Sequence, residues 1–147
     1  MLSTSSITSA KDVLQRIEAV DWNHIPQDLD SHGNAIIENL ICSNDCGALV
    51  NLYSEYGIFR SRVVMEQHGF GQGEYKYFSY PLPDIIDSLR TTIYPHLAPI
   101  ANQWNEMMNI MDVRYPENHS DFIARCHDAG QLKPTQLLLK YGKDEYK

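Results

Sequence analysis

A long helical pattern in the middle of the chain separates the segments that favour β-strands. After Pro83, apolar residues recur at spacings of three and four as far as Met107, which places them on one face of a helix. Pro95 and Pro99 lie inside this stretch, and each proline removes a backbone hydrogen-bond donor. We therefore expect either two helices or one strongly kinked helix.

Strand-like segments lie on both sides of this helix. Phe59–Met65 begins with alternating apolar and polar residues, and Tyr75–Phe78 is a short aromatic segment after a glycine-rich loop. Thr135–Tyr141 places its alternate leucines and its final tyrosine on one face, because side chains alternate across a strand. Two further short strands are expected, at residues 34–38 and 112–115.

Helices are expected elsewhere. Ser9 and Asp12 form the pattern of a capping box, so a first helix should continue to about residue 20. The following residues, 21–33, are rich in turn formers. A second helix is capped by residues 43–45 and carries Cys46 on its apolar face, and a last helix should occupy residues 116–130.

The composition is that of one globular domain spanning residues 1–147. Apolar residues make up 43% of the chain and charged residues 21%, which permits a core and argues against disorder. The formal net charge is −7, and Arg60 and Arg62 form the tight basic pair. Nucleic-acid-binding surfaces usually gather many lysines and arginines, so we expect no nucleic-acid partner.

The sequence also bears on cellular location. No segment has the apolar length of a transmembrane helix, and the first residues lack the pattern of a secretory signal. The three cysteines, Cys42, Cys46 and Cys126, are an odd number, which favours reduced thiols. We expect a cytoplasmic protein with no membrane partner.

Two patterns suggest metal sites, and each has a simpler interpretation. His119-Ser-Asp121 has the His-x-Asp spacing of non-haem iron motifs. Its surroundings favour a helix, where positions two apart lie about 200° apart, so a histidine beside the core is preferred. Cys42 and Cys46 have a spacing used by zinc sites, with Cys126 and His127 as further ligands. Buried free cysteines on apolar helix faces are preferred.

The loop His68–Gly73 carries three glycines. It is not a phosphate-binding loop, because no Lys-Ser/Thr pair follows, and it opens no βαβ unit. Two interpretations of this loop remain open: a mobile loop that covers a ligand, and an ordinary turn. No Gly-x-Ser-x-Gly nucleophile elbow is present. By spacing alone, Tyr141 is a core tyrosine whose hydroxyl finds a partner.

Four ordered stretches carry a resemblance to a known family: Phe59–Phe78, Tyr80–Pro83, Leu89–Asn105 and Pro134–Gly142. Over most of residues 34–146 the chain resembles bacterial oxygenases that depend on 2-oxoglutarate and Fe(II) and are similar to prolyl hydroxylases. The resemblance implies an α+β fold, in which N-terminal helices precede the first strands of an incomplete double-stranded β-helix, or jelly roll.

In such enzymes a His-x-Asp motif follows the strand that corresponds to the one ending at Tyr141, and a second histidine and a basic residue come much later. The motif holds Fe(II), the basic residue pairs with 2-oxoglutarate, and the co-substrate is decarboxylated to succinate while the substrate is hydroxylated. The sequence ends at Lys147, before the motif is expected. The resemblance therefore implies a truncated dioxygenase without metal ligands or catalytic residues. Fe(II) and 2-oxoglutarate are expected as cofactors of the full-length family, and none for this chain alone.

The resemblance also assigns candidate binding residues. Tyr141 resembles a tyrosine that lines the 2-oxoglutarate pocket. Five residues fall where related enzymes place a segment that covers the substrate: Arg60, Arg62, Tyr75, Lys76 and Tyr77. The substrate remains open among a protein side chain, a free amino acid and a small metabolite.

Two functional hypotheses follow. The first is an oxygenase cut short, and the second is a non-catalytic interaction domain or one half of a split oxygenase. A jelly roll closes by pairing strands in two sheets, so we expect an open strand edge at residues 135–142. That edge predicts low stability, or association with a C-terminal half or with a second copy.

Overall fold

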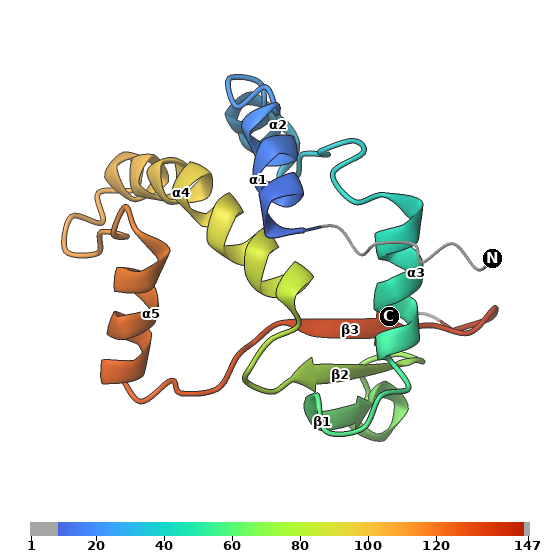
Figure 1. The fold of residues 1–147 in the computed structure, drawn as a ribbon. Helices are drawn as coiled ribbons and strands as arrows, with labels where there is room; N and C mark the ends of the chain where they lie inside the picture. Colours follow the sequence, from blue (N-terminus) through green and yellow to red (C-terminus); the bar gives the residue numbers. More distant parts are fainter. Residues whose placement is uncertain (1–8, 146–147) are drawn as a thin grey trace.

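The computed structural model describes residues 9–145 as an α+β fold (Figure 1). In this part of the chain, five α-helices and one 3-10 turn accompany a three-stranded sheet. In chain order the elements are α1 (Ala10–Glu18), α2 (Ile25–His32), α3 (Ser43–Leu52), β1 (Phe59–Val64), η1 (Met65–His68), β2 (Glu74–Phe78), α4 (Asp84–Met107), α5 (His119–Asp128) and β3 (Leu137–Lys140). None of the helices within residues 9–145 is long and apolar enough to cross a membrane. Residues 1–8, where the sequence predicts no secretory signal, lie outside the described part.

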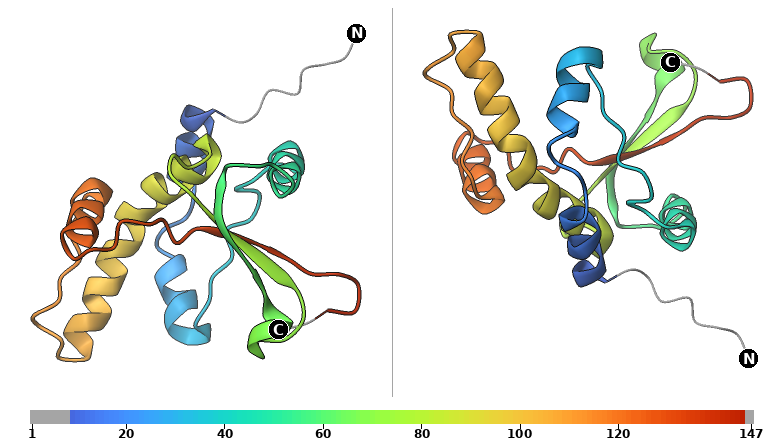
Figure 2. Two further views of the ribbon diagram at one scale, coloured as in Figure 1. Left: turned by 90° about the horizontal axis from the view of Figure 1, so that it is seen from below. Right: turned by 90° about the horizontal axis from the view of Figure 1, so that it is seen from above.

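The sheet is antiparallel, and β2 lies between β1 and β3. β1 and β2 form a hairpin, whereas β3 follows α4 and α5 in the chain and returns to pair with β2 (Figure 2). The register joins Glu74 to Lys140 and Tyr77 to Leu137. Among the described residues β3 is therefore an edge strand.

The core lies mainly between α1 and α4, which pack against each other (Figure 1). Val13 and Ile17 are four residues apart, so they share one face of α1, and both are buried. The sheet contributes Phe78, the last residue of β2, which has no exposed surface. The buried apolar residues together are Val13, Ile17, Ile25, Met65, Phe78, Leu82, Ile85, Ala98 and Ile100.

Helix α1 begins with the expected capping box. The backbone N–H of Asp12 donates to Ser9 Oγ over 3.3 Å, and the backbone N–H of Ser9 donates to Asp12 Oδ2 over 3.1 Å. Each contact satisfies a donor that the helix leaves unpaired. The sequence prediction of this N-terminus is therefore confirmed.

Helix α3 begins with a similar pair of contacts, between Cys42 and Asp45. Asp45 is fully buried and accepts a hydrogen bond from the backbone N–H of Cys42 over 3.3 Å. Arg16 of α1 forms an ion pair with the same carboxylate at 3.1 Å. Because α3 turns Asp45 inwards, the next residue, Cys46, is exposed, and the prediction that Cys46 lies on the apolar face is wrong.

The structure decides between the two alternatives for the long helix and adds a helix to the turn-rich residues 21–33. α4 continues past Pro95 and Pro99, which excludes two separate helices; each proline removes only its own donor, and α1 packs along the helix. The turn-rich residues 21–33 contain α2, which has Pro26 in its first turn and ends at Gly33 with φ 72°. Proline at a helix start and glycine just past its end are favoured positions, so these turn formers bound a helix.

The short strands predicted at residues 34–38 and 112–115 are not formed. The second of these segments is bound to α4 instead. The side chain of Asn102 donates to the carbonyl of Tyr115 over 2.9 Å and accepts from its backbone N–H over 2.7 Å. These bonds satisfy backbone groups that would otherwise favour a sheet partner.

Candidate functional site

The predicted binding residues lie on the sheet, and strand alternation divides them between its two faces. Arg62 pairs with Lys76, and directly paired residues point to the same side of a sheet. Tyr75 and Tyr77 flank Lys76 and therefore point to the other side. The sequence treats these residues as one group, and the structure does not bring them all together.

Arg62 and Lys76 form a charged cluster with Glu74 of β2 and with Tyr53, which directly follows α3. Arg62 Nε donates to Glu74 Oε2 over 2.8 Å, and the hydroxyl of Tyr53 donates to Glu74 Oε1 over 2.9 Å. Lys76 Nζ donates to the carbonyl of Tyr53 over 2.7 Å and lies 4.4 Å from the centre of its ring. The Arg62 contact joins β1 to β2, and the contacts of Tyr53 join the end of α3 to the sheet.

The charges of this cluster shift two pKa values. Arg62 lowers the pKa of Glu74, and this effect is larger than the opposing effect of burial. Burial and the hydrogen bond to Glu74 raise the pKa of the Tyr53 phenol. Tyr53 therefore stays a hydrogen-bond donor and Glu74 an acceptor over a wide range of pH.

We expect replacement of Glu74 by glutamine to reduce stability at pH 7 and to reduce it progressively less as pH falls below 4.5. A carboxyl whose folded-state pKa lies below its ordinary value of 4.5 stabilises the fold fully above that value and loses this contribution as pH falls through the folded-state pKa. Urea unfolding of both proteins across about pH 3–7 measures the difference. A gap that stays constant over this range would contradict the assignment.

Arg60, Tyr75 and Tyr77 form an aromatic face on the other side of the sheet. The register between β1 and β2 shifts between Phe59 and Ser61, and a bulge of this kind turns a side chain to the opposite face. The guanidinium carbon of Arg60 accordingly lies 4.4 Å from the ring centre of Tyr77. Tyr77 meets Tyr75 edge to face, with ring centres 5.5 Å apart.

Tyr141 lies just past β3, where its ring packs against the backbone of Gly73. It is 41% exposed, so it is not the core tyrosine that spacing alone suggests. A Cβ atom at Gly73 would lie 2.7 Å from Tyr141 Cδ1, and the φ angle of Gly73 is 129°. Only glycine fits here without strain, and it brings Tyr141 to the end of β2 that leads into Tyr75 and Tyr77.

Replacement of Gly73 by alanine is expected to cost about 2 kcal/mol of stability, because the new methyl group meets both the Tyr141 ring and the Lys140 carbonyl. Urea unfolding checks the value. Gly69 offers a matched control, since its φ is also positive but a Cβ there meets nothing within 4 Å. If both variants lose the same stability, the Tyr141 contact contributes nothing.

The described residues, 9–145, contain no group of three His, Cys, Asp or Glu side chains placed to hold a metal. His119 begins α5 and turns toward α4, with its ring centre 5.2 Å from that of Tyr94. Asp121 is exposed and accepts a hydrogen bond from Asn118. Residues 9–145 thus do not supply the donor set that an Fe(II) site of this kind requires.

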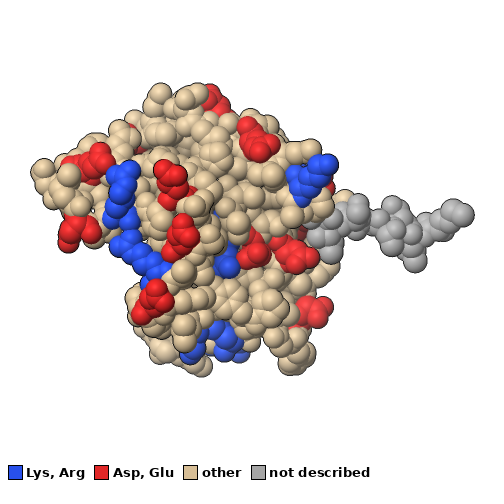
Figure 3. All heavy atoms as spheres, turned by 60° about the vertical axis from the view of Figure 1, so that its left-hand side comes forward, with Lys and Arg blue, Asp and Glu red and all other residues tan. Residues whose placement is uncertain are grey.

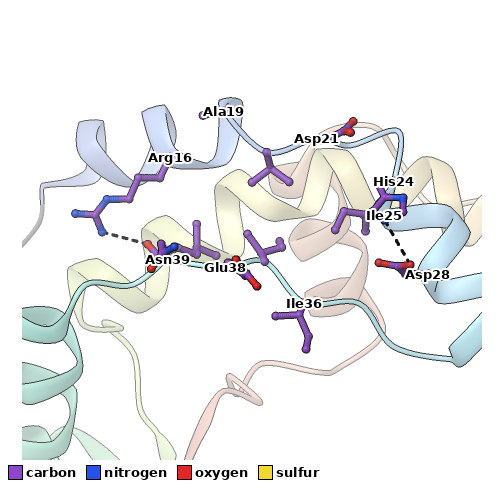
Figure 4. A pocket seen from close by; sticks show the side chains of 12 residues that line it. Arg16, Ala19, Asp21, His24, Ile25, Asp28, Ile36, Glu38 and Asn39 are labelled. Carbon is purple, nitrogen blue, oxygen red and sulfur yellow. Dashed lines mark hydrogen bonds and ion pairs between the residues drawn. The ribbon is translucent and has the colours of Figure 1, made fainter.

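Several hollows lie away from the aromatic face, and two of them bear on the argument. One, of about 390 Å³, lies between α1, α2 and residues 36–40 (Figure 4). Its walls carry acidic side chains including Asp28, whose Oδ1 is 3.8 Å from His24 Nε2. None of the predicted binding residues lines this hollow.

The other hollow, of about 610 Å³, lies between α4, α5 and residues 130–136. Tyr80, Arg90 and Gln136 line it, and sequence reasoning assigned no role to any of them. All three fall inside the stretches that carry the family resemblance, but only the fold brings them together. Burial, with a smaller effect of the nearby Arg90 charge, lowers the pKa of His119 at this hollow.

The surface charge is mixed on the face shown in Figure 3, where lysines and arginines form a short stripe bordered by acidic side chains. This pattern accompanies the formal net charge of −7. It differs from the continuous basic surface that tracks a phosphate backbone.

Comparison with known proteins connects the sheet to a family. The family described as "Oxygenase, catalysing oxidative methylation of damaged DNA" matches residues 73–147, which is just over half of the chain. The match begins at Gly73, so it covers β2, β3 and Tyr141.

Two uncharacterised proteins of Mycobacterium tuberculosis are also similar: MT2286 of strain CDC 1551 / Oshkosh and Rv2227 of strain ATCC 25618 / H37Rv. Each is 38% identical over 69 residues, which are 47% of this chain and 29% of the relative. The matched part therefore spans less than a third of these relatives. No solved structure matches the chain. Because the family match covers half of its residues, the chain belongs to this family of oxygenases.

Proposed function

We propose that this chain is the N-terminal part of a 2-oxoglutarate- and Fe(II)-dependent dioxygenase of the prolyl-hydroxylase-like kind. It would supply the helical support, the first strands of an incomplete jelly roll, and the surface on which co-substrate and substrate meet. The observation that carries the proposal is the position of Tyr141. Gly73 lets its ring close on the end of β2, next to the aromatic face of Tyr75, Tyr77 and Arg60.

In this proposal the chain's own residues bind and orient. The Tyr141 hydroxyl, on a half-exposed side chain, would donate a hydrogen bond to a carboxylate of 2-oxoglutarate. Arg60 and the two tyrosines of the aromatic face would contact the substrate. Arg62 and Lys76, also predicted as substrate-binding, contact Glu74 and Tyr53, and we propose that they support the sheet.

Fe(II), when bound with 2-oxoglutarate, supplies the oxidising chemistry of such enzymes. The described residues do not fit the metal, so we assign them no step of oxygen activation. We propose that the His-x-Asp and the distal histidine come from polypeptide outside residues 9–145. Incubation of the chain alone with Fe(II), 2-oxoglutarate and ascorbate should release no succinate, and release above a metal-free blank would overturn this part.

Binding of 2-oxoglutarate to the chain alone tests the role of Tyr141 directly. A titration followed by NMR should shift signals near Gly73 and Tyr141. Tyr141→Phe should weaken binding about three- to tenfold, the range expected for one hydrogen bond. Tyr56→Phe is the matched control, because Tyr56 is almost completely exposed. Equal binding by the parent protein and both variants would show that the Tyr141 hydroxyl does not bind 2-oxoglutarate.

The second candidate function is a non-catalytic interaction domain, or one half of a split oxygenase. β3 is an edge strand among the described residues, and Leu139 on it is 54% exposed, which favours pairing with another chain. Sedimentation of the purified protein measures self-association. Leu139→Lys should reduce it, and a monomer at all concentrations would contradict pairing with a second copy.

We further propose a small-molecule or protein substrate in the cytoplasm rather than nucleic acid. The family's description names damaged DNA, so DNA is the alternative to test. The net charge of −7 and the mixed surface of Figure 3 support the expectation that the chain binds DNA only weakly. Fluorescence anisotropy with a labelled oligonucleotide at low salt should show no saturable binding, and submicromolar affinity would reverse this proposal.

A further inference from the structure

The hollow between α4, α5 and residues 130–136 is separate from the proposed co-substrate pocket. It encloses about 610 Å³, a size suited to a small molecule. Gln136, in its wall, precedes β3, whereas Tyr141 follows β3. The hollow therefore lies at the opposite end of this strand from the proposed co-substrate pocket, and its function does not depend on that proposal.

The charged side chains that line this hollow are basic, in a protein that is acidic as a whole. Arg90 and Lys133 line it, together with the imidazoles of His119 and His127, and no carboxylate does. The arginine side chain is only 16% exposed, so its charge is partly shielded from water. A guanidinium in such a position attracts an anion more strongly than one on an open surface.

Arg90 is held in place before any ligand arrives. Asp87 lies 3.1 Å from its Nε and 3.0 Å from its Nη2. On the other side, Nη1 donates to the hydroxyl of Tyr80 over 3.0 Å. Because that oxygen already accepts from arginine, the phenolic hydrogen remains available to a second acceptor. The pair thus offers donors to a carboxylate at small entropic cost.

The remaining wall is apolar, with one buried polar atom. Phe122, Ile123, Leu132 and Pro134 form it. The Oε1 atom of Gln136 is buried and has no hydrogen-bond partner. A buried acceptor without a partner is costly, and a donor on a molecule in the hollow would satisfy it after a small side-chain adjustment.

We propose that this hollow is a binding site for an aromatic monocarboxylate that carries a hydrogen-bond donor away from its carboxylate. The carboxylate binds Arg90 and the Tyr80 hydroxyl. The ring lies against Phe122 and Ile123, and the donor reaches Gln136. Nothing in the family match assigns a ligand to these residues.

The probe is 4-hydroxybenzoate, titrated into isotopically labelled protein and followed by NMR. Saturable shifts are expected for residues 119–136 and around Arg90. Arg90→Met and Tyr80→Phe should each weaken binding about tenfold, as expected for lost charge-assisted hydrogen bonds. Tyr80→Phe keeps the ring, so it tests the hydroxyl if the arginine variant does not fold. Arg114→Met, at an exposed arginine outside the hollow, is the matched control and should bind normally.

Three further compounds define the class. 4-Hydroxybenzamide lacks the charge, and inorganic phosphate lacks the ring, so both should bind at least about tenfold more weakly than 4-hydroxybenzoate. 2-Oxoglutarate should not displace 4-hydroxybenzoate from the hollow. The proposal is wrong if the amide or phosphate binds equally well, if shifts fall outside this region, or if neither Arg90→Met nor Tyr80→Phe weakens binding.

Discussion

Replacement of Asp45 by alanine is expected to destabilise the protein by about 3–5 kcal/mol, because the change removes a fully buried carboxylate that forms an ion pair with Arg16. Asp45 has no exposed surface and binds both the backbone of Cys42 and the guanidinium of Arg16. The loss therefore removes the α3 cap and the ion pair between α1 and α3. Urea unfolding followed by circular dichroism measures it.

Control variants separate the contribution of the ion pair to stability from the effect of any substitution. Asp128→Ala, at an exposed position, should change stability by less than about 0.5 kcal/mol. Arg16→Met should also be destabilising, because it removes the guanidinium that forms an ion pair with the buried Asp45 carboxylate. The double variant should lose less than the sum of the two single changes. Strict additivity would show that Asp45 and Arg16 are not coupled.

Replacement of Phe78 by alanine is expected to cost about 3–5 kcal/mol, the usual loss when a buried phenylalanine leaves a cavity. Phe78 has no exposed surface, stacks on Phe59 with ring centres 4.8 Å apart, and ends the central strand of the sheet. Its backbone N–H also bonds to Gln136 just before β3, so a cavity here would loosen the junction of β2 and β3.

Phe70 is the control for this change, because it is 54% exposed. Phe70→Ala should reduce stability by less than about 1 kcal/mol. Chemical denaturation compares the variants with the parent protein. Phe78→Leu should lose less than Phe78→Ala, since it fills more of the cavity. If the alanine and leucine variants are equally stable, cavity formation is not the cause.

Local sequence patterns predicted the features that depend on near neighbours. Ser9 and Asp12 cap α1 as expected, and the strand patterns near Phe59, Tyr75 and Leu137 became β1, β2 and β3. The helical spacing after Pro116 became α5. Capping and alternation are fixed by residues within a few positions of each other, so a single sequence contains the information.

The sequence also predicted the broad class of family correctly. The resemblance predicted an oxygenase, and the match over residues 73–147 supports that. It also selected Tyr141, but it gave no sign that Gly73 would lie against the ring. These two residues are far apart in the chain, and only the pairing of β2 with β3 brings them into contact.

Only the tertiary structure decided the direction of side chains and the partners that they meet from distant parts of the chain. The register shift after Phe59 sends Arg60 to the aromatic face, while Arg62 remains beside Glu74. Likewise, the burial of Asp45, and not Cys46, follows from Arg16 on another helix. An apolar pattern with the period of a strand or a helix assigns each residue to a face of that element, but it does not say what packs on that face. The sequence by itself therefore indicated most of the elements and the oxygenase family. Packing determined which charged residues contact Glu74 and Tyr53 and which one lies against the aromatic face.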